Sequence, residues 1–353
     1  MRKFGVLFGL ISSLFFAGCQ PDKPAPQPEP VSITAPANLG KTVPFPERNP
    51  FTREGILLGK KLFYDPILSG NNSISCASCH LPQKAFSDDL ALSTRGITGK
   101  PLLRHAPALQ NLAWMPGWFW DGGAKDIESL NFGPLTHPDE MAQNLKELVS
   151  ELKNHPEYPN LFKAAFPSDT ISSTTITRAL AQFERTLISS NSRYDKYVRK
   201  EDGGNLTVPE LEGLALVKQK CASCHATDFF TDFGYHNNGL DQTYSDKNEA
   251  LEWGRGRISG NPADIGKYKT PTLRNIALTA PYMHDGRFKT LAEVLEHYNS
   301  GVKNSATLDP LLQKNNRLGI ALTAAEKEKI ILFLNTLTDR EFTTDPDFLP
   351  AKP

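Results

Sequence analysis

The residues best suited to chemistry occur in two copies of one five-residue pattern. Each copy holds two cysteines separated by Ala-Ser and a histidine directly after the second cysteine: Cys76, Cys79 and His80 in the first, and Cys221, Cys224 and His225 in the second. Cysteines at this spacing can form thioethers with the two vinyl groups of a porphyrin, and the histidine can ligate its iron. A redox dithiol needs no such histidine, and a zinc site rarely repeats an identical pattern. The sequence therefore predicts two covalently bound haem c groups.

The length and charge of the chain limit the number of domains and the kinds of partner that we expect. The chain has 353 residues, and its 39 Lys+Arg are balanced by 39 Asp+Glu. Because no basic surplus is available to neutralise phosphates, we expect no nucleic-acid partner. The length suits about two domains, each with a hydrophobic core.

The N-terminus is predicted to be an export signal. Two basic residues precede an apolar run from Phe4 to Ala17, which is shorter than the roughly 20 residues that span a bilayer. The run ends in Ala-Gly-Cys19, which resembles the lipobox of bacterial lipoproteins; the alternative is an ordinary cleavable signal. We therefore expect a lipoprotein signal peptide at 1–18, a lipid on Cys19 that anchors the protein to the membrane, and a periplasmic location.

The next segment is proline-rich. Residues 20–50 contain nine prolines, a composition that favours extended chain and does not support a core. We expect 19–50 to be a tether between the membrane and the folded part of the protein.

The rest of the chain is predicted to be all-α. Thr207 precedes Glu210 at capping-box spacing just before the second haem pattern, and Thr323 and Glu326 make a similar start near the C-terminus. No stretch shows sustained strand alternation. We predict two c-type cytochrome domains, each with one haem: 51–205, and 206–353 after a Gly-Gly interruption.

Several further motifs, in a fixed order around the two haem patterns, give a more specific indication. They resemble the bacterial di-haem cytochrome c peroxidase family, which includes MauG, and the resemblance extends from about Asn49 to Leu337. The motifs are Arg104–Asn111, Phe119–Asp126, Gly133–Leu135 and Asp139–Met141 after the first pattern, and Pro271–Asn275 and Ala280–Gly286 after the second.

The resemblance implies a proton-transfer residue. Peroxide cleavage needs an iron with an open position and a group that moves a proton between the peroxide oxygens. In the family this group is a glutamate six residues after the proline of a Gly-Pro motif, which corresponds to Glu140 after Pro134. Burial would raise the pKa of that carboxyl. Residue type alone would instead place Glu140 at the start of the following helix. Pro134 is implied to line the same distal pocket.

Trp120 matches the tryptophan that lies between the two haems in the family. The resemblance implies that its indole relays electrons between the irons, and the alternative is a core aromatic, because Trp114 and Trp118 occur in the same segment.

The region around the first haem departs from the better-known peroxidases in three ways. A histidine that caps the resting iron in those enzymes is replaced by Gly96, so we expect an open or water-bound iron; His105 is the alternative ligand. His105 also occupies the position where the family has an asparagine that helps bind calcium. Whether a calcium ion binds through Thr279 and Pro281 therefore stays an open question at this point. Leu130 replaces a glutamine of the distal pocket.

The second haem departs at its distal ligand. Fourteen residues after the histidine of the His-Asp-Gly motif, the peroxidases have methionine and MauG has tyrosine, and here the residue is Tyr298. Thr290 and Glu293 are expected to cap a helix that turns Tyr298 inward. Met283 is the rival ligand, and His297 is expected off that face. A phenolate would lower the potential of the iron, whereas a thioether would raise it.

These features support three functions. The leading prediction is a di-haem peroxidase that reduces hydrogen peroxide to water with electrons from a small cytochrome c or a cupredoxin. The second is a MauG-like enzyme that oxidises side chains of a partner protein, and the third is a non-catalytic electron carrier. A homodimer is one assembly that the sequence allows.

Overall fold

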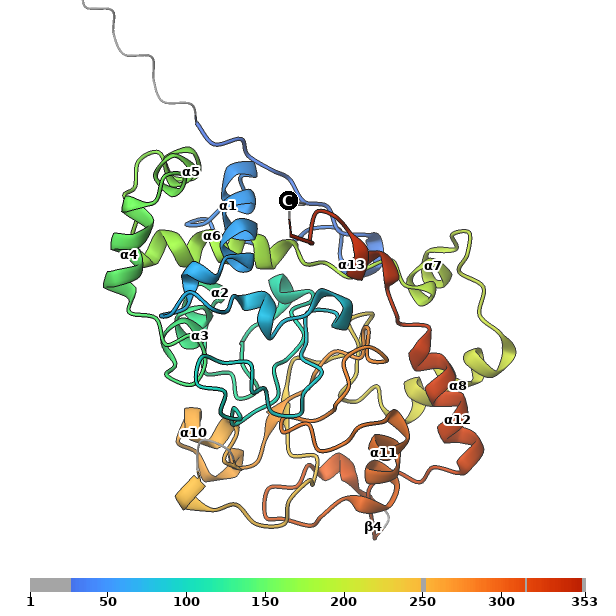
Figure 1. Ribbon diagram of the computed structural model, residues 1–353. Coiled ribbons are helices and arrows are strands. Elements are labelled where there is room, and N and C mark those ends of the chain that lie inside the picture. Colours follow the sequence, from blue (N-terminus) through green and yellow to red (C-terminus); the bar gives the residue numbers. More distant parts are fainter. Residues whose placement is uncertain (1–26, 249–251, 315, 351–353) are drawn as a thin grey trace, which may run out of the picture.

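The computed structural model describes residues 27–248, 252–314 and 316–350, and these residues are mostly helical (Figure 1). The predicted signal peptide at 1–18 and Cys19 lie outside the described residues. Strands in the described part are two residues long and form two antiparallel pairs, β1 with β2 and β3 with β4. The prediction of a mostly helical chain is therefore confirmed. The α-helices and strands are α1 (Arg53–Tyr64), α2 (Ile127–Leu130), α3 (Phe132–Thr136), α4 (Leu145–Asn154), α5 (Tyr158–Ala165), α6 (Ser173–Thr186), α7 (Arg193–Arg199), α8 (Val208–Lys220), β1 (Tyr235–His236), α10 (Arg255–Ser259), β2 (Tyr268–Lys269), α11 (Leu291–Glu296), β3 (Gln313–Lys314), β4 (Arg317–Leu318), α12 (Ala324–Asn335) and α13 (Arg340–Thr344).

The first hydrophobic core forms where α1 packs on α6. Thr52 caps α1 by accepting a hydrogen bond from the Gly55 backbone N–H. The two helices approach closely at Gly59, where a Cβ would lie 1.9 Å from the Ala179 carbonyl oxygen. Only glycine fits at that contact. The core extends through α2, α4 and α5 to the chain around the first haem pattern.

The second core forms where α8 packs on α12, with a similar close contact. A Cβ at Gly213 would lie 2.0 Å from the Lys329 carbonyl oxygen. The two predicted capping boxes are confirmed, because Glu210 accepts a hydrogen bond from the Thr207 N–H at 2.7 Å and Glu326 accepts one from the Thr323 N–H at 2.8 Å. These caps fix where each helix begins.

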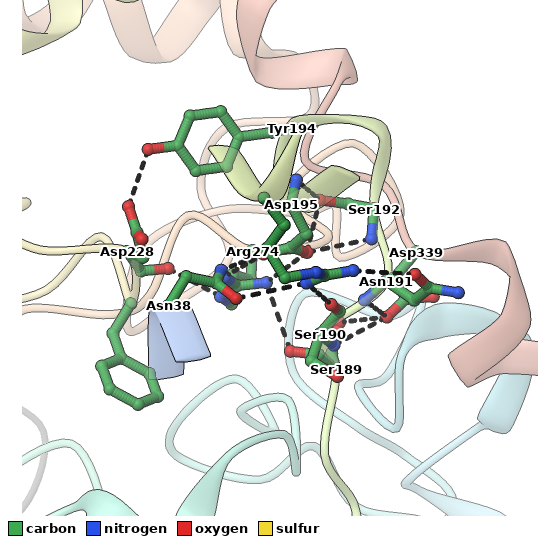
Figure 2. Close-up of polar contacts among 12 residues, drawn as sticks. Asn38, Ser189, Ser190, Asn191, Ser192, Tyr194, Asp195, Asp228, Arg274 and Asp339 are labelled. Atoms are coloured by element: carbon green, nitrogen blue, oxygen red, sulfur yellow. Dashed lines mark hydrogen bonds and ion pairs between the residues drawn. The ribbon is translucent and has the colours of Figure 1, made fainter. Parts of the chain in front are cut away.

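A buried polar network joins the segment after α6 to the segment after β2 (Figure 2). Both guanidinium Nη atoms of Arg274 bond the two carboxylate oxygens of Asp195, at 2.9 and 2.6 Å, and neither side chain is exposed to solvent. Arg274 also donates to the Ser189 carbonyl at 3.2 Å, and Asp339 accepts from the Ser189 hydroxyl at 3.0 Å. The network therefore links the segment that follows α6 of the first core to the segment that follows α12 of the second core.

The proline-rich segment is not an extended tether over its described part. From residue 31 onward it folds back, and its buried Ala35, Leu39 and Val43 form a small core with Phe51 and with later chain that includes Trp114. The prediction for 19–50 is therefore wrong for this stretch. Its scattered apolar residues bury their side chains despite the prolines between them.

No helix in the described ranges is long and apolar enough to cross a membrane.

Candidate haem-binding active site

One continuous cavity of roughly 1040 Å³ contains both cysteine-histidine patterns. All six residues of the two patterns line it, together with Glu140, Trp120 and Tyr298. Most of the residues that line it belong to irregular chain of both halves. In Figure 1 this irregular chain lies at the centre of the molecule, with most helices around it. The residues predicted to do chemistry are thus brought together around one space.

The two patterns have the same local geometry. In each, the histidine N–H bonds back to the carbonyl of the first cysteine, His80 to Cys76 at 3.0 Å and His225 to Cys221 at 2.9 Å. This single turn places both sulfurs and the imidazole on the cavity side. In the second pattern the turn directly continues α8, whereas α1 ends well before the first pattern.

Each pattern histidine is held by its Nδ1 atom. Nδ1 of His80 lies 2.9 Å from the Phe86 carbonyl oxygen, and Nδ1 of His225 lies 2.9 Å from the Phe230 carbonyl oxygen. Metal-ligating histidines are oriented in this way, with one ring N–H donated to a carbonyl and the other nitrogen directed at the metal. Burial lowers the pKa of His80 to about 4, against the opposing carbonyl bond, and keeps the imidazole in its neutral, ligating form.

The residues present fit haem c. The four pattern cysteines are not paired in disulfides, so their sulfurs are available for thioether bonds. The two cysteines and the neutral imidazole of each pattern line the same cavity, and this is the set of groups that covalent haem attachment and iron ligation require.

Glu140 lies in a tight turn rather than at the start of a helix. Helix α4 begins at Leu145 and is capped by Asn144, so the alternative role at a helix start does not apply. The turn is held by the Glu140 N–H bonding the His137 carbonyl at 3.0 Å, and by the Glu140 carbonyl accepting from the Ile97 N–H at 2.8 Å. Burial raises the pKa of Glu140, and the neighbouring His137 partly opposes this shift.

The position of the missing capping histidine cannot hold any side chain. A Cβ at Gly96 would lie 1.9 Å from the Asp139 carbonyl oxygen, in the same turn that carries Glu140. His105 does not replace it, because its Nε2 lies 3.2 Å from the Ser87 hydroxyl and its Nδ1 lies 2.9 Å from the Leu90 carbonyl oxygen. Both ring nitrogens of His105 are thus occupied by the protein. Leu130 lines the cavity, so an apolar side chain takes the place of the glutamine.

His137 is a residue of the site that the sequence reasoning missed. It lines the cavity, its Nδ1 lies 3.7 Å from a Glu140 carboxylate oxygen, and its side chain is 44% exposed. The Glu140 side chain is itself 33% exposed, and Nδ1 of His137 accepts a hydrogen bond from the Asp139 N–H at 3.2 Å. The Gly-Pro-Leu-Thr-His spacing was the signal available in the sequence.

Trp120 is bonded to chain from both halves. Its indole Nε1 donates to the His105 carbonyl at 2.8 Å, and its backbone carbonyl accepts from the Lys269 N–H at 2.8 Å. The His105 N–H in turn bonds the His284 carbonyl at 2.8 Å. These bonds fix an indole that faces the same cavity as both haem patterns.

Tyr298 lies on a π-helix that continues α11. The predicted cap of α11 is confirmed, since Thr290 accepts from the Glu293 N–H at 3.2 Å, and residues His297–Gly301 then widen into π-helical turns. Such insertions are frequent at functional sites. The Tyr298 side chain lines the cavity, and its burial raises the pKa of the phenol to about 12.

His297 and Met283 are the two residues near Tyr298 whose positions bear on the distal ligand of the second haem. His297 is buried, with Nε2 3.0 Å from the Asn238 carbonyl oxygen, and it does not line the cavity. Met283 does line the cavity and so remains the rival of Tyr298. Among the described residues, Cys224, Asp232 and His236 form a group of metal-ligand types, but Cys224 belongs to the second cysteine-histidine pattern. We assign no further metal to that group.

Comparisons with known proteins agree with this site. The family model described as di-haem cytochrome c peroxidase matches residues 53–203. The chain is 36% identical to the methylamine utilization protein MauG of Methylorubrum extorquens over 84% of this chain and 82% of the relative. It is 37% identical to cytochrome c551 peroxidase of Nitrosomonas europaea, over 84% and 82%.

Among solved structures, a MauG-like protein associated with microbial copper homeostasis superimposes with a TM-score of 0.78 at 34% identity, covering 94% of this chain and 99% of that one. The two relatives and this solved structure each cover more than four fifths of this chain. The chain therefore belongs to the di-haem cytochrome c peroxidase and MauG family.

Proposed function

We propose that the protein is a periplasmic di-haem peroxidase that reduces hydrogen peroxide to water. Each turnover consumes two electrons and two protons and yields two water molecules. The electrons come from a small redox protein, a cytochrome c or a cupredoxin. Membership of the peroxidase family and the shared cavity of both haem patterns support this proposal.

One arrangement carries the proposal most strongly. The carboxyl of Glu140 lines the cavity that His80 also lines, while no side chain fits at Gly96 and both nitrogens of His105 are bonded elsewhere. An acid thus faces an open space near the first haem pattern. This is the environment that a bound peroxide requires.

The cofactors and the surrounding side chains have distinct roles. His80 and His225 would each hold one haem c, Tyr298 would supply a further ligand at the later haem, and the bound haems would supply the redox chemistry of peroxide reduction. Glu140 takes a proton from one peroxide oxygen and returns it to the other. Pro134 lines the same cavity and restricts water around the carboxyl. The Glu140 side chain is 33% exposed, so solvent replaces its proton directly.

Trp120 relays electrons between the two haem sites. Its indole donates to the His105 carbonyl, its backbone carbonyl accepts from the Lys269 N–H, and its side chain lines the same cavity as both patterns. An immobilised indole loses little energy to reorganisation when its charge changes, which suits it to this role.

A MauG-like activity on a partner protein is the second candidate. The phenol of Tyr298 and the absence of a capping side chain at Gly96 favour it, as does the likeness to a MauG-like protein associated with copper homeostasis. In this function, the same peroxide chemistry would withdraw electrons from side chains of a docked protein through Trp120.

The remaining parts of the proposal concern organisation and location. We propose the haem domains 51–205 and 206–353, supported by the two separate hydrophobic cores, although Tyr194 packs in the second core and Phe342 in the first. The proposed lipid on Cys19 anchors the protein in the periplasm. A calcium ion near Thr279 and Pro281, which line the cavity, and a homodimer complete the proposal.

Turnover with peroxide tests the leading function. Purified protein carrying both haems should oxidise reduced cytochrome c or a reduced cupredoxin in a peroxide-dependent, catalytic reaction. Reaction with peroxide without steady oxidation of any such donor would favour the MauG-like activity instead. No reaction with peroxide would exclude both.

A further inference from the structure

Asn238 lies between the two candidate ligands of the second haem. It follows β1 and lines the cavity together with Met283 and Tyr298. Its amide Nδ2 donates a hydrogen bond to the Met283 sulfur at 3.3 Å. The same side chain also contacts Tyr298. A primary amide has two N–H groups, so it can serve both partners.

The backbone around Asn238 is firmly held. The preceding Asn237 accepts from the Gly239 N–H at 2.9 Å through its side chain and from the Asp309 N–H at 3.0 Å through its carbonyl. The Asn238 carbonyl itself accepts from Nε2 of His297 at 3.0 Å. The amide is therefore presented from a rigid segment that is bonded directly to the π-helix of Tyr298.

Met283 is held at its backbone as well as at its sulfur. It has a φ of +76°, which is unusual for a residue with a side chain, and its carbonyl accepts from the Gly286 N–H at 3.2 Å. The turn is closed by the Tyr282 N–H, which bonds the Phe288 carbonyl at 2.7 Å. With the backbone fixed, only rotation of the side chain could bring the sulfur to an iron, and the bond to Asn238 opposes that rotation.

We propose that Asn238 is a positioning residue that selects Tyr298 over Met283 as the distal ligand of the second haem. The amide N–H engages the lone pair of the thioether and holds the sulfur, while the same side chain contacts the tyrosine. This inference rests on the proposed function, which assigns that ligand to Tyr298. It explains why the tyrosine oxygen, rather than the methionine sulfur, would bind the iron in a cavity that contains both.

The choice of ligand has a consequence for function. A phenolate favours the oxidised iron, whereas a thioether favours the reduced iron. Selection by Asn238 therefore keeps the second haem at a lower potential than Met283 would give it.

The test is to remove both N–H groups and read the ligand directly. Asn238→Leu abolishes them, and Asn238→Asp keeps the size of the side chain without a donor. Absorption, electron paramagnetic resonance and the midpoint potential of the second haem are measured on the two-haem protein. In both variants we expect the charge-transfer band of an iron-phenolate to be replaced by the signature of a thioether ligand, with a shift to higher potential.

The double variant Asn238→Leu with Met283→Leu identifies the sulfur, since it should lose the thioether signature. Asn154→Leu, at the exposed end of α4, is a matched control that should leave the spectrum unchanged. Unchanged phenolate spectrum and potential in both Asn238 variants would overturn the inference. An unsubstituted protein without a phenolate band would instead overturn the Tyr298 assignment in the proposed function, so the two failures are distinguishable.

Discussion

Replacing Glu140 by glutamine tests the proton-transfer role in the proposed reaction. Glutamine keeps the shape of the side chain but cannot accept or release a proton at neutral pH. A positioned acid-base group contributes typically 10²–10⁴-fold to a rate. We therefore expect Glu140→Gln to slow the reaction with peroxide by about 10²–10⁴-fold, which corresponds to roughly 3–5 kcal/mol of activation free energy.

The structure also predicts how the rate of the reaction with peroxide depends on the position of the Glu140 carboxyl and on pH. Glu140→Asp retracts the carboxyl by about one methylene, and a displacement near 1 Å can cost on the order of 10²-fold. Because burial raises the pKa of Glu140, the carboxyl loses its proton at a higher pH than an exposed glutamate does. The limb of the pH-rate profile that reports this group should therefore lie above the ordinary glutamate value and vanish in Glu140→Gln.

Stopped-flow mixing with peroxide measures these rates, and haem content must match that of the unsubstituted protein. Glu151→Gln, on the exposed side of α4, changes the same functional group away from the cavity and should react at the original rate. If Glu140→Gln reacts within threefold of the unsubstituted protein, the carboxyl does not carry the proton, and the reasoning is refuted.

Three further predictions follow from other parts of the structure. Trp120→Phe should leave peroxide binding at the first haem intact but slow electron transfer between the haems, which rapid-mixing absorption spectra would show; an unchanged transfer rate would exclude the relay. Arg274→Met should lower the free energy of unfolding by about 3–5 kcal/mol in denaturant titrations, because it leaves the buried Asp195 carboxylate unpaired; a loss below about 1 kcal/mol would contradict the importance of this pair. Burial raises the pKa of Glu184 to about 7, against the bond from Asn131, so its contribution to stability should be present below about pH 4.3 and disappear as pH rises through 7. In Glu184→Gln, the free energy of unfolding measured at a series of pH values should no longer decrease over this range. If it decreases as in the unsubstituted protein, the pKa of Glu184 is not raised.

Much of the fold and site could be predicted because the signals are local. A capping box consists of two residues three positions apart, so Thr290 with Glu293 predicted the start of α11 correctly. The haem patterns are similarly local, and the hydrogen bonds of His80 and His225 agree with their predicted role. The placement of Glu140 in the cavity followed from its spacing after Pro134 in the family.

What was missed depends on contacts between distant segments. The apolar residues of 31–50 are too sparse to indicate a core, and they become one only by packing together with chain beyond Phe51. Asn238 and Met283 are 45 positions apart, and no pattern in the sequence connects the amide with the sulfur. Gly96 could be seen to lack a side chain, but only the folded turn shows that none would fit there.

The most direct test of the whole account is the electron paramagnetic resonance spectrum of the oxidised protein, recorded before and after peroxide is added without any reductant. We predict one high-spin and one low-spin ferric haem, with the high-spin signal consumed by peroxide at once. Two low-spin signals that ignore peroxide would contradict an accessible iron beside Glu140 and leave only electron conduction as the function.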